Sequence, residues 1–470
     1  MPPPSDLRVI IVGAGLAGLI MAIMLEKAGI DYHILEQASR LRPLGTSISL
    51  HPVILDIVDQ LGLLDEMVAM SKPLRGITVL SSKGRKVGRI DTRSKKQKRG
   101  HQAMVMSRPD LHELLLSKIP AQKLTTGMRV LGMTETQSGV LVTCADESTF
   151  FGHLVVGADG AYSATRRIMY SDLKMQGLLP EADKTPLYVD KQCVVGMTCP
   201  LDPVKYPVLL DSGCEVKVLL GKDQHTSMWI LPLQGNRLAW CVGGPDPQMM
   251  MQDTGSGRSS PSNHSHGSGR QSPPSSIGRG RQSPTSSGRN SPQDWYPETA
   301  VEICEDVRNF KCPYGGSVMD IIDATPKGLV SKVLLEEKMC CTWYHGRIVL
   351  IGDACHKIVP FFGQGASQAI LDAACLVNML YDLPSRSSAD LTAIFKSYVE
   401  QRSGPARVAS DSSREFADLI YDQGFKADVA RSIVLRFTPM WLLRMITGTT
   451  TGIRPGLTFL PPPTGTGKLL

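Results

Sequence analysis

The chain has 470 residues, of which 42% are hydrophobic and 20% are charged, and its formal net charge is +7. A chain of this length and apolar content can bury a large core, and we expect two or three domains. A membrane-spanning helix is not predicted, because the longest apolar stretch, SIVLRFTPMWLLRMI, is interrupted by Arg436, Pro439 and Arg444.

The start of the chain and its cysteines predict an intracellular, cytoplasmic location. MPPPSDLR runs into the first strand without an apolar leader, so we expect no signal peptide. The eleven cysteines include no C-x-x-C pair and no Cys/His cluster at zinc spacing, which favours reduced thiols and no metal site. The SIVLRFTPMWLLRMI segment is expected to pack against the protein; a peripheral membrane contact through Trp441 and the arginines is the alternative.

The first predicted nucleotide site follows a buried strand over residues 9–12. The turn GAGLAG contains Gly13, Ala14, Gly15 and Gly18 and leads into an apolar helix that ends near Gly29. Gly13 permits a tight turn, Gly15 lets the backbone approach a pyrophosphate, and Gly18 lets the helix pack closely on the strand. The unpaired N–H groups at the start of the helix favour bound phosphate.

An acidic residue follows at the position where a ribose would lie. The second strand, Tyr32 to Leu35, ends on Glu36, whose carboxylate can accept hydrogen bonds from a ribose 2′-hydroxyl. A carboxylate there disfavours a 2′-phosphate, so the expected dinucleotide is FAD or NAD. The alternative is that Glu36 only ends an exposed strand.

Positive charge is concentrated between Lys83 and Arg99, where the sequence has nine basic residues and a single acidic one, Asp91. We interpret this run as a solvated hairpin or loop, and the alternative is an attraction for an anionic cofactor or surface. The run lacks aromatic residues that could stack on bases, so no nucleic-acid partner is predicted.

The middle of the chain predicts a sheet and then a disordered insert. Apolar or alternating runs begin at Glu215, Thr226 and Asn236 and suggest an antiparallel sheet. Residues 254–293 contain one large apolar side chain and repeat a GRxSP unit, which predicts disorder. The repeats place four serines before prolines, so the insert is either a phosphorylation target or a tolerated surface insertion: Ser260, Ser272, Ser283 and Ser291.

A second glycine-bearing turn lies more than three hundred residues after the first. A strand predicted over Arg347 to Ile351 ends in Gly352 and Asp353, whose carboxylate could take the ribityl hydroxyls of FAD. Pro360 and the GQGA segment, which is Gly363, Gln364, Gly365 and Ala366, precede a helix expected to begin near Ser367. The N-terminus of that helix would favour the negative charge of reduced flavin.

Three motifs taken in order carry a family resemblance. They are GAGLAG; Gly157 to Gly160 (GADG) followed by Ser163 and Arg166; and Gly352-Asp353 followed by Pro360 and GQG. Over roughly residues 8 to 385 the chain resembles the single-component, FAD-dependent aromatic hydroxylase class of monooxygenases. A narrower likeness is to fungal FAD monooxygenases that epoxidise or hydroxylate terpenoid and polyketide-derived products, and to salicylate-hydroxylase-like enzymes.

The resemblance implies further cofactor contacts. Asp159 in GADG and Arg108 in SRPDL correspond to residues that contact FAD in this class. Ser49 and Ala366 stand where relatives often have glycine, and backbone contacts to the flavin could survive both changes. Lys357 stands where the motif commonly has proline after histidine.

The implied fold is α/β: a Rossmann-like FAD-binding domain interrupted by an antiparallel β-sheet substrate domain, with C-terminal helices. The expected boundaries are 1–187 and 326–385 for the two parts of the FAD-binding domain, 188–325 for the substrate domain and 386–470 for the helical region. The implied reaction uses NAD(P)H as a transient co-substrate and O2, and transfers oxygen to a small organic molecule through a flavin C4a-hydroperoxide.

No catalytic base is predicted. His51 could approach the flavin pocket, but a single histidine before Pro52 is more often structural. Two other functions compete with the monooxygenase: a flavin-dependent halogenase, of whose tryptophan motif only Trp229 is present, and a non-catalytic flavin-fold scaffold. Joint retention of the four residues expected to contact the cofactor argues against the scaffold: Glu36, Arg108, Asp159 and Asp353.

Overall fold

The computed structural model describes residues 6–41, 45–92, 102–221, 226–245, 304–305, 307–421, 431, 433–435 and 455–463. The predicted insert 254–293, residues 93–99 of the basic run and Trp441 lie outside the described residues. Within the described residues, no helix combines the length and the apolarity needed to cross a membrane.

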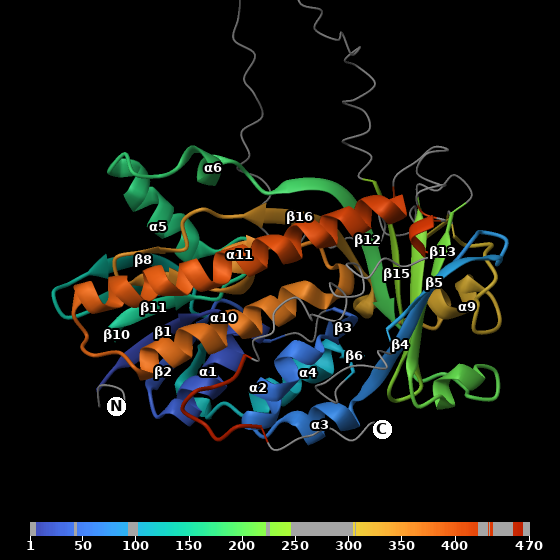
Figure 1. The fold of residues 1–470 in the computed structure, drawn as a ribbon, viewed down its shortest axis with the longest axis horizontal. Helices are drawn as coiled ribbons and strands as arrows, with labels where there is room; N and C mark the ends of the chain where they lie inside the picture. Colours follow the sequence, from blue (N-terminus) through green and yellow to red (C-terminus); the bar gives the residue numbers. More distant parts are fainter. Residues whose placement is uncertain are drawn as a thin grey trace, which may run out of the picture.

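A six-stranded sheet lies in one half of the molecule (Figure 1). Its order is β17 (Tyr344–His345), β18 (Ile348–Leu350), β11 (Leu154–Gly157), β1 (Arg8–Val12), β2 (Asp31–Glu36) and β7 (Leu124–Thr126). All neighbouring pairs are parallel except β17 with β18. The central strands read as continuous apolar runs because a parallel sheet is covered on both faces.

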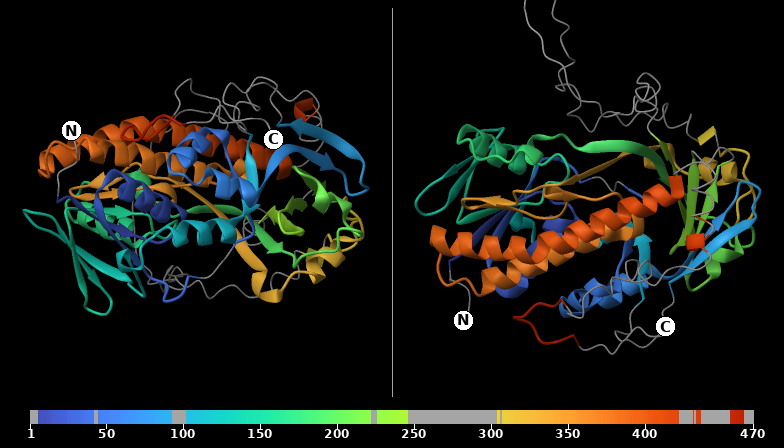
Figure 2. Two further views of the ribbon diagram at one scale, coloured as in Figure 1. Left: turned by 90° about the horizontal axis from the view of Figure 1, so that it is seen from below. Right: turned by 45° about the horizontal axis from the view of Figure 1, so that its top comes forward.

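Three helices are stacked in this half. The first helix, α1 (Leu16–Ala28), contacts α10 (Gln364–Tyr381), and α10 in turn contacts α11 (Ser388–Tyr421). Both views in Figure 2 show α11 and α10 side by side. As predicted, α1 ends at Gly29, which takes the left-handed conformation with φ 70°. The start of α10 differs from the prediction: it begins at Gln364 because Gly363 already caps it, with φ 65°.

The second large sheet has ten strands. Its order is β19 (His356–Lys357), β16 (Ser331–Met339), β12 (Tyr188–Met197), β15 (Arg237–Pro245), β14 (Ser227–Leu233), β13 (Cys214–Leu220), β4 (Ser71–Leu80), β6 (Met104–Ser107) and β3 (Ser47–Leu50), with β5 (Lys86–Asp91) paired to β4. Neighbours are antiparallel except β13 with β4. The sheet therefore extends beyond residues 188–325, since it recruits β4 and β16 from the flanking parts of the chain.

Smaller elements complete the fold. A three-stranded sheet consists of β10 (Thr149–Gly152), β9 (Val140–Cys144) and β8 (Val130–Glu135). The other α-helices of the described residues are α2 (Leu55–Gln60), α3 (Leu64–Ala69), α4 (Arg108–Ser117), α5 (Ala164–Met175), α6 (Glu181–Lys184) and α9 (Val318–Asp323). This is the predicted α/β class, with a Rossmann-like part interrupted by a largely antiparallel sheet.

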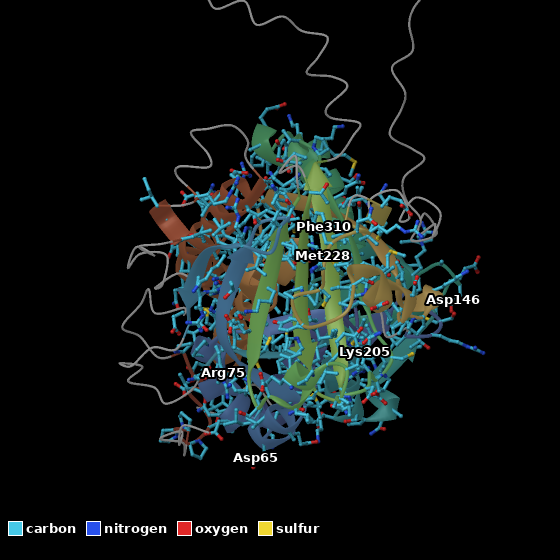
Figure 3. The ribbon with its side chains drawn as sticks, turned by 90° about the vertical axis from the view of Figure 1, so that its right-hand side faces the viewer. Asp65, Arg75, Asp146, Lys205, Met228 and Phe310 are labelled. Carbon is cyan, nitrogen blue, oxygen red and sulfur yellow. The ribbon has the colours of Figure 1, made fainter. Side chains whose placement is uncertain are left out.

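The two faces of the ten-stranded sheet have different partners. Strand residues alternate between faces. One set packs in a small core with Phe310, as Figure 3 shows for Met228; it includes Val194, Ile230, Trp240 and Val242. The alternate residues point toward the six-stranded sheet and line a cavity: Val195, Trp229, Leu231 and Cys241.

Candidate cofactor and substrate site

A cavity of about 470 Å³ lies between the two sheets. Residues after the carboxyl ends of β1, β11 and β18 line one end: Gly15, Ala158 and Asp353. In parallel sheets, ligands bind beyond the carboxyl ends of the strands. The cavity therefore joins the expected nucleotide position to the face of the second sheet.

In the first turn, two glycines leave no space for a side chain, and the third has free space at its Cβ position. A Cβ at Gly13, where φ is 106°, would come within 2.6 Å of the Ala158 carbonyl oxygen, and a Cβ at Gly18 within 2.0 Å of the Gly13 carbonyl oxygen. Gly15 has no neighbouring atom within 4 Å of its Cβ position and lines the cavity. The predicted division of roles among the three glycines thus matches the packing: two allow close contact, and one leaves the backbone accessible.

Glu36 holds this turn in place. Its Oε2 accepts a hydrogen bond from the Ala14 N–H at 2.8 Å, and its Oε1 accepts one from the Ala38 N–H at 2.8 Å. A carboxylate has about four acceptor positions, so capacity for a ribose hydroxyl is left. Glu36 does more than end an exposed strand.

Arg108 reaches the cavity from the start of α4. Ser107 caps that helix by accepting a hydrogen bond from the Asp110 N–H at 3.3 Å. The Arg108 side chain passes so close to Gly45 that a Cβ there would lie 2.9 Å from Arg108 Cδ. Burial lowers the pKa of Arg108, and the nearby charge of Asp353 opposes that shift. Arg108 and Asp353, 245 positions apart in the chain, therefore line the same cavity close enough for their charges to interact.

The GADG motif contains an incompletely satisfied carboxylate. Asp159 Oδ2 accepts hydrogen bonds from the Thr165 N–H at 3.0 Å and the Thr165 hydroxyl at 3.1 Å. Its Oδ1 is buried and has no hydrogen-bond partner among the described residues. A buried acceptor without a donor is costly, so this oxygen points to a bound group that supplies one.

Arg166 links the GADG motif to the second turn. Ser163 caps α5 by accepting a hydrogen bond from the Arg166 N–H at 2.8 Å, and Arg166 Nη1 donates to the Ala354 carbonyl oxygen at 2.6 Å. Two motifs nearly two hundred residues apart are thereby held in one place.

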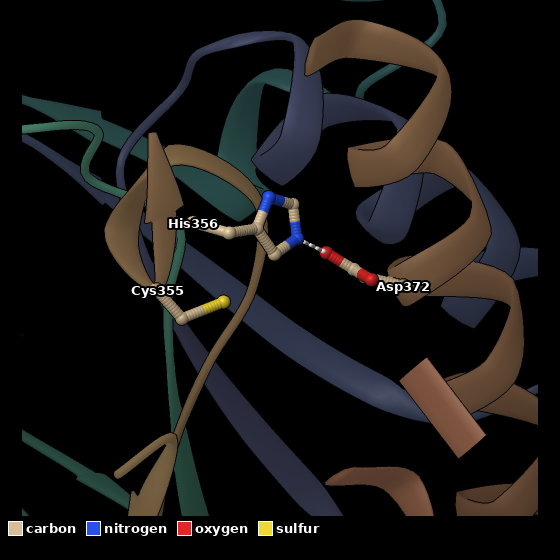
Figure 4. A group of neighbouring side chains, drawn as sticks. All are labelled: Cys355, His356 and Asp372. Atoms are coloured by element: carbon tan, nitrogen blue, oxygen red, sulfur yellow. Dashed lines mark hydrogen bonds and ion pairs between the residues drawn. The ribbon is translucent and has the colours of Figure 1, made fainter. Parts of the chain in front are cut away.

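A buried cluster of charged residues supports the part of the second turn that contains Gly352 and Asp353. Asp372 Oδ2 accepts a hydrogen bond from His356 Nε2 at 2.5 Å (Figure 4). Oδ2 also accepts one from the Gly352 N–H at 3.0 Å, and Oδ1 accepts one from Arg402 Nε at 2.8 Å. Burial raises the pKa of Asp372, but the charges of His356 and Arg402 outweigh it and bring the pKa to about 2.

This cluster was missed in the sequence. Asp372 lies eight residues beyond the start of α10 in an apolar helix, and Arg402 lies on α11; no spacing rule connects them. Cys355, His356 and Asp372 bring three atoms that could bind a metal within 4.8 Å of one another. Because both Asp372 oxygens already accept hydrogen bonds, the group is better described as a structural ion cluster.

The GQGA segment passes directly over β3. Gly363 has φ 65°, and a Cβ there would lie 2.1 Å from the Ser49 carbonyl oxygen. Pro360, Gly363, Gly365, Ala366 and Ser49 all line the cavity. The predicted residues of the second turn are therefore brought together with Gly15 and Arg108.

The end of the cavity beside the second sheet is apolar. Leu74, Ile77, Val216 and Leu335 line it together with three aromatic residues, Trp229, Phe361 and Tyr421. The Trp229 and Phe361 rings lie 5.6 Å apart between centroids. Among the described residues, the charged side chains that line the cavity are Arg108, Asp353 and Lys357, and Lys357 forms an ion pair with Asp353.

His51 is not part of this cavity. It is buried, and its backbone N–H donates to the Ser367 hydroxyl at 3.3 Å. Its side chain borders a second cavity, between α10 and α11. This position supports a structural role for His51.

The geometry of the site is typical of a dinucleotide-binding protein with an apolar cavity at the end of the dinucleotide site. The open Gly15, the unpartnered Asp159 Oδ1 and the approach of Gly363 to Ser49 fit an elongated, phosphate-bearing cofactor held by backbone groups.

Comparisons with known proteins identify the family. Residues 6–191 and 319–413 match the model of the FAD binding domain. An FAD-dependent monooxygenase of Tolypocladium album is 30% identical over 388 residues, covering 80% of this chain and 70% of the relative. The FAD-dependent monooxygenase atmM of Aspergillus flavus is 27% identical over 475 residues, covering 98% of this chain and 88% of the relative.

Solved structures share the fold. Klebsiella pneumoniae HpxO, crystallised with FAD and uric acid, has a TM-score of 0.69 at 20% identity, covering 94% of this chain and 96% of that chain. Pseudomonas aeruginosa PqsL, in complex with 2-aminobenzoylacetate, has a TM-score of 0.63 at 18% identity, covering 92% and 100%. The chain belongs to the FAD-binding-domain family and is an FAD-dependent monooxygenase, an oxidoreductase with FAD as its cofactor.

Proposed function

We propose that this monooxygenase uses NAD(P)H and O2 to hydroxylate or epoxidise a small, uncharged and largely apolar substrate. The observation that carries the proposal is the division of the cavity into an end with charged residues and glycine turns and an end with aliphatic and aromatic side chains. A charged substrate would lose its hydration at the apolar end without gaining a partner from the described lining. The fungal FAD-dependent monooxygenases that the chain matches are consistent with an aromatic or terpenoid substrate.

The proposal assigns FAD to the residues predicted from the sequence. Gly13, Ala14, Gly15 and Gly18 form the pyrophosphate turn, and Glu36 takes the ribose. Arg108, Asp159 and Asp353 supply polar contacts in the middle of the cofactor. Ser49, Pro360, Gly363, Gly365 and Ala366 surround its flavin end.

Bound FAD, once reduced, supplies the electrons with which one atom of O2 is transferred to the substrate. The protein holds the substrate beside the cofactor and keeps water away through the apolar lining around Trp229 and Phe361. The N–H groups at the start of α10 would stabilise negative charge on a flavin bound beside them. We assign no catalytic base, since no carboxylate, histidine or lysine among the described residues lines the apolar end.

The purified protein tests this function directly. We expect a yellow protein with bound FAD, whose NAD(P)H oxidation accelerates with a prenylated or phenolic substrate and whose product contains one more oxygen atom. Isotopic label from 18O2 is expected in the product. A halogenated product in the presence of chloride or bromide would contradict the proposal, as would label derived from water.

Asp353 tests the assignment of the cofactor residues. Asp353→Ala removes a carboxylate that lines the cavity, and we expect at least about a tenfold loss of FAD affinity, equivalent to about 1.4 kcal/mol. Asp323→Ala, on α9 outside the cavity lining, is the matched control and is expected to keep its FAD. Fluorescence titration of the apoproteins with FAD measures both, and equal affinities would refute the assignment.

A further inference from the structure

Lys357 is a cation in the cofactor cavity that the FAD assignment above does not use. It follows the second turn on β19, where its backbone pairs with Lys338 of β16. Its Nζ donates to Asp353 Oδ2 at 2.7 Å, and its side chain is 26% exposed. Proline, which is expected at this place from the family resemblance, has no charge and could not form this ion pair.

The ion pair orients the Asp353 carboxylate. Lys357 holds Oδ2, and the other carboxylate oxygen, Oδ1, lies 3.8 Å from the Cβ position of Gly365 in the GQGA segment. That position borders the cavity and has no closer neighbour. A carboxylate with one oxygen anchored and the other directed at the cofactor is preorganised to accept hydrogen bonds.

The charges that line the cavity are unbalanced. Among the described lining residues, Arg108 and Lys357 are positive and Asp353 is negative, which leaves one net positive charge. Asp353 holds Lys357 in its charged form and raises its pKa, while Arg108 opposes that shift. Glu336 is the other acidic group near Lys357, but its carboxylate accepts a hydrogen bond from the Tyr162 hydroxyl and lies outside the lining.

We propose that Lys357 is a cofactor-positioning residue that orients Asp353 toward FAD and stabilises reduced FAD relative to oxidised FAD. When FAD takes up two electrons and one proton, its ring system gains one negative charge. A cation in a partly desolvated cavity stabilises the anionic reduced ring more than it stabilises the neutral oxidised ring. The proposal rests on the cofactor assignment made under Proposed function.

The test compares Lys357→Met, which keeps the length of the side chain and removes its charge, with Lys357→Arg, which keeps the charge. We measure the dissociation constant of oxidised FAD by fluorescence titration and the two-electron midpoint potential by dye-coupled reduction. For Lys357→Met, the preference for reduced over oxidised FAD is expected to fall about tenfold, which lowers the potential by about 30 mV. Lys357→Arg is expected to retain most of the preference.

Lys332→Met on β16 is the matched control, because it removes the same charge from outside the cavity lining. An unchanged potential in Lys357→Met would overturn the proposal, and so would an equal change in Lys357→Arg. If Lys357→Met folds by circular dichroism but does not hold FAD, recovery of binding in Lys357→Arg supports the proposal, and failure to recover overturns it. The Asp353→Ala titration distinguishes failure of the Lys357 proposal from failure of the cofactor assignment. If that variant keeps FAD, the cofactor assignment itself is wrong.

Discussion

Single residues in this site are constrained by backbone contacts as much as by side-chain chemistry. The Gly363 φ of 65° is a conformation that L-residues rarely adopt, and its Cβ position is occupied by the Ser49 carbonyl group. By contrast, Ala366 carries a Cβ and still lines the cavity within α10. The position of a glycine, rather than the number of glycines, therefore decides whether it can be replaced.

We predict that Gly363→Ala displaces the GQGA segment from β3 and weakens FAD binding at least about tenfold, since left-handed backbone costs a residue with a Cβ about 1–2 kcal/mol before any clash is counted. Gly404→Ala is the control, because Gly404 is exposed on α11 and its Cβ position is open. The control is expected to be neutral or stabilised by up to about 1 kcal/mol. FAD titration and thermal unfolding measure the pair. Retention of wild-type affinity by Gly363→Ala would mean that the segment does not need this backbone contact.

At the scale of elements, a buried ion cluster connects three segments: the second turn, α10 and α11. Asp372 on α10 is fully buried and joins His356, Arg402 on α11 and the Gly352 N–H. A buried cluster of this kind is strongly destabilised when one member is removed, because the remaining charge is left unpaired. The cluster therefore holds the turn that carries Asp353 against the helices.

We predict that Asp372→Asn lowers the free energy of unfolding by about 3–5 kcal/mol near neutral pH. The pKa of Asp372 is about 2 in the folded protein, below the ordinary value of 3.8, so its ionisation stabilises the fold above pH 4 and this contribution is lost as the pH falls toward 2. The difference between the wild type and Asp372→Asn should therefore shrink over that interval. Urea unfolding at several pH values measures it. Asp411→Asn, exposed on α11, is expected to change stability by less than about 0.5 kcal/mol; a pH-independent difference for Asp372→Asn would contradict the assignment.

At the scale of the whole molecule, the cofactor cavity lies where the two large sheets meet. Its lining comes from the turns after β1, β11 and β18 and from β12, β13, β14 and β15 of the second sheet. A ligand that fills the cavity contacts both halves and binds only the folded chain. Folding and cofactor binding are therefore thermodynamically linked.

We predict that removal of FAD lowers the thermal unfolding temperature and that added FAD restores it. The stabilisation should follow the concentration of FAD and reach about 2.7 kcal/mol at a hundred times the dissociation constant. Differential scanning calorimetry of the apoprotein with increasing FAD measures this dependence, with NAD as the control ligand. An unfolding temperature independent of FAD would show that the cofactor does not join the two halves.

Much of the site was predictable because its contacts are local. The turn from Gly13 to Gly18 needs particular residues at neighbouring positions, and its roles could be assigned before its packing was known. The same holds for the strand that ends on Glu36 and for the left-handed glycine that caps α1. Backbone geometry over a few residues is encoded by those residues alone.

Contacts between distant segments were decided only by the tertiary structure. The sequence by itself determined the α/β class, the two glycine-bearing turns and the strands of the middle region, because local backbone preference and apolar periodicity specify them. The recruitment of β4 and β16 into the ten-stranded sheet, the Asp372 cluster and the pairing of Lys357 with Asp353 beside Arg108 depend on how the chain crosses between sheets. Such contacts form between segments that have no fixed spacing in the sequence, and therefore no local sequence pattern predicts them.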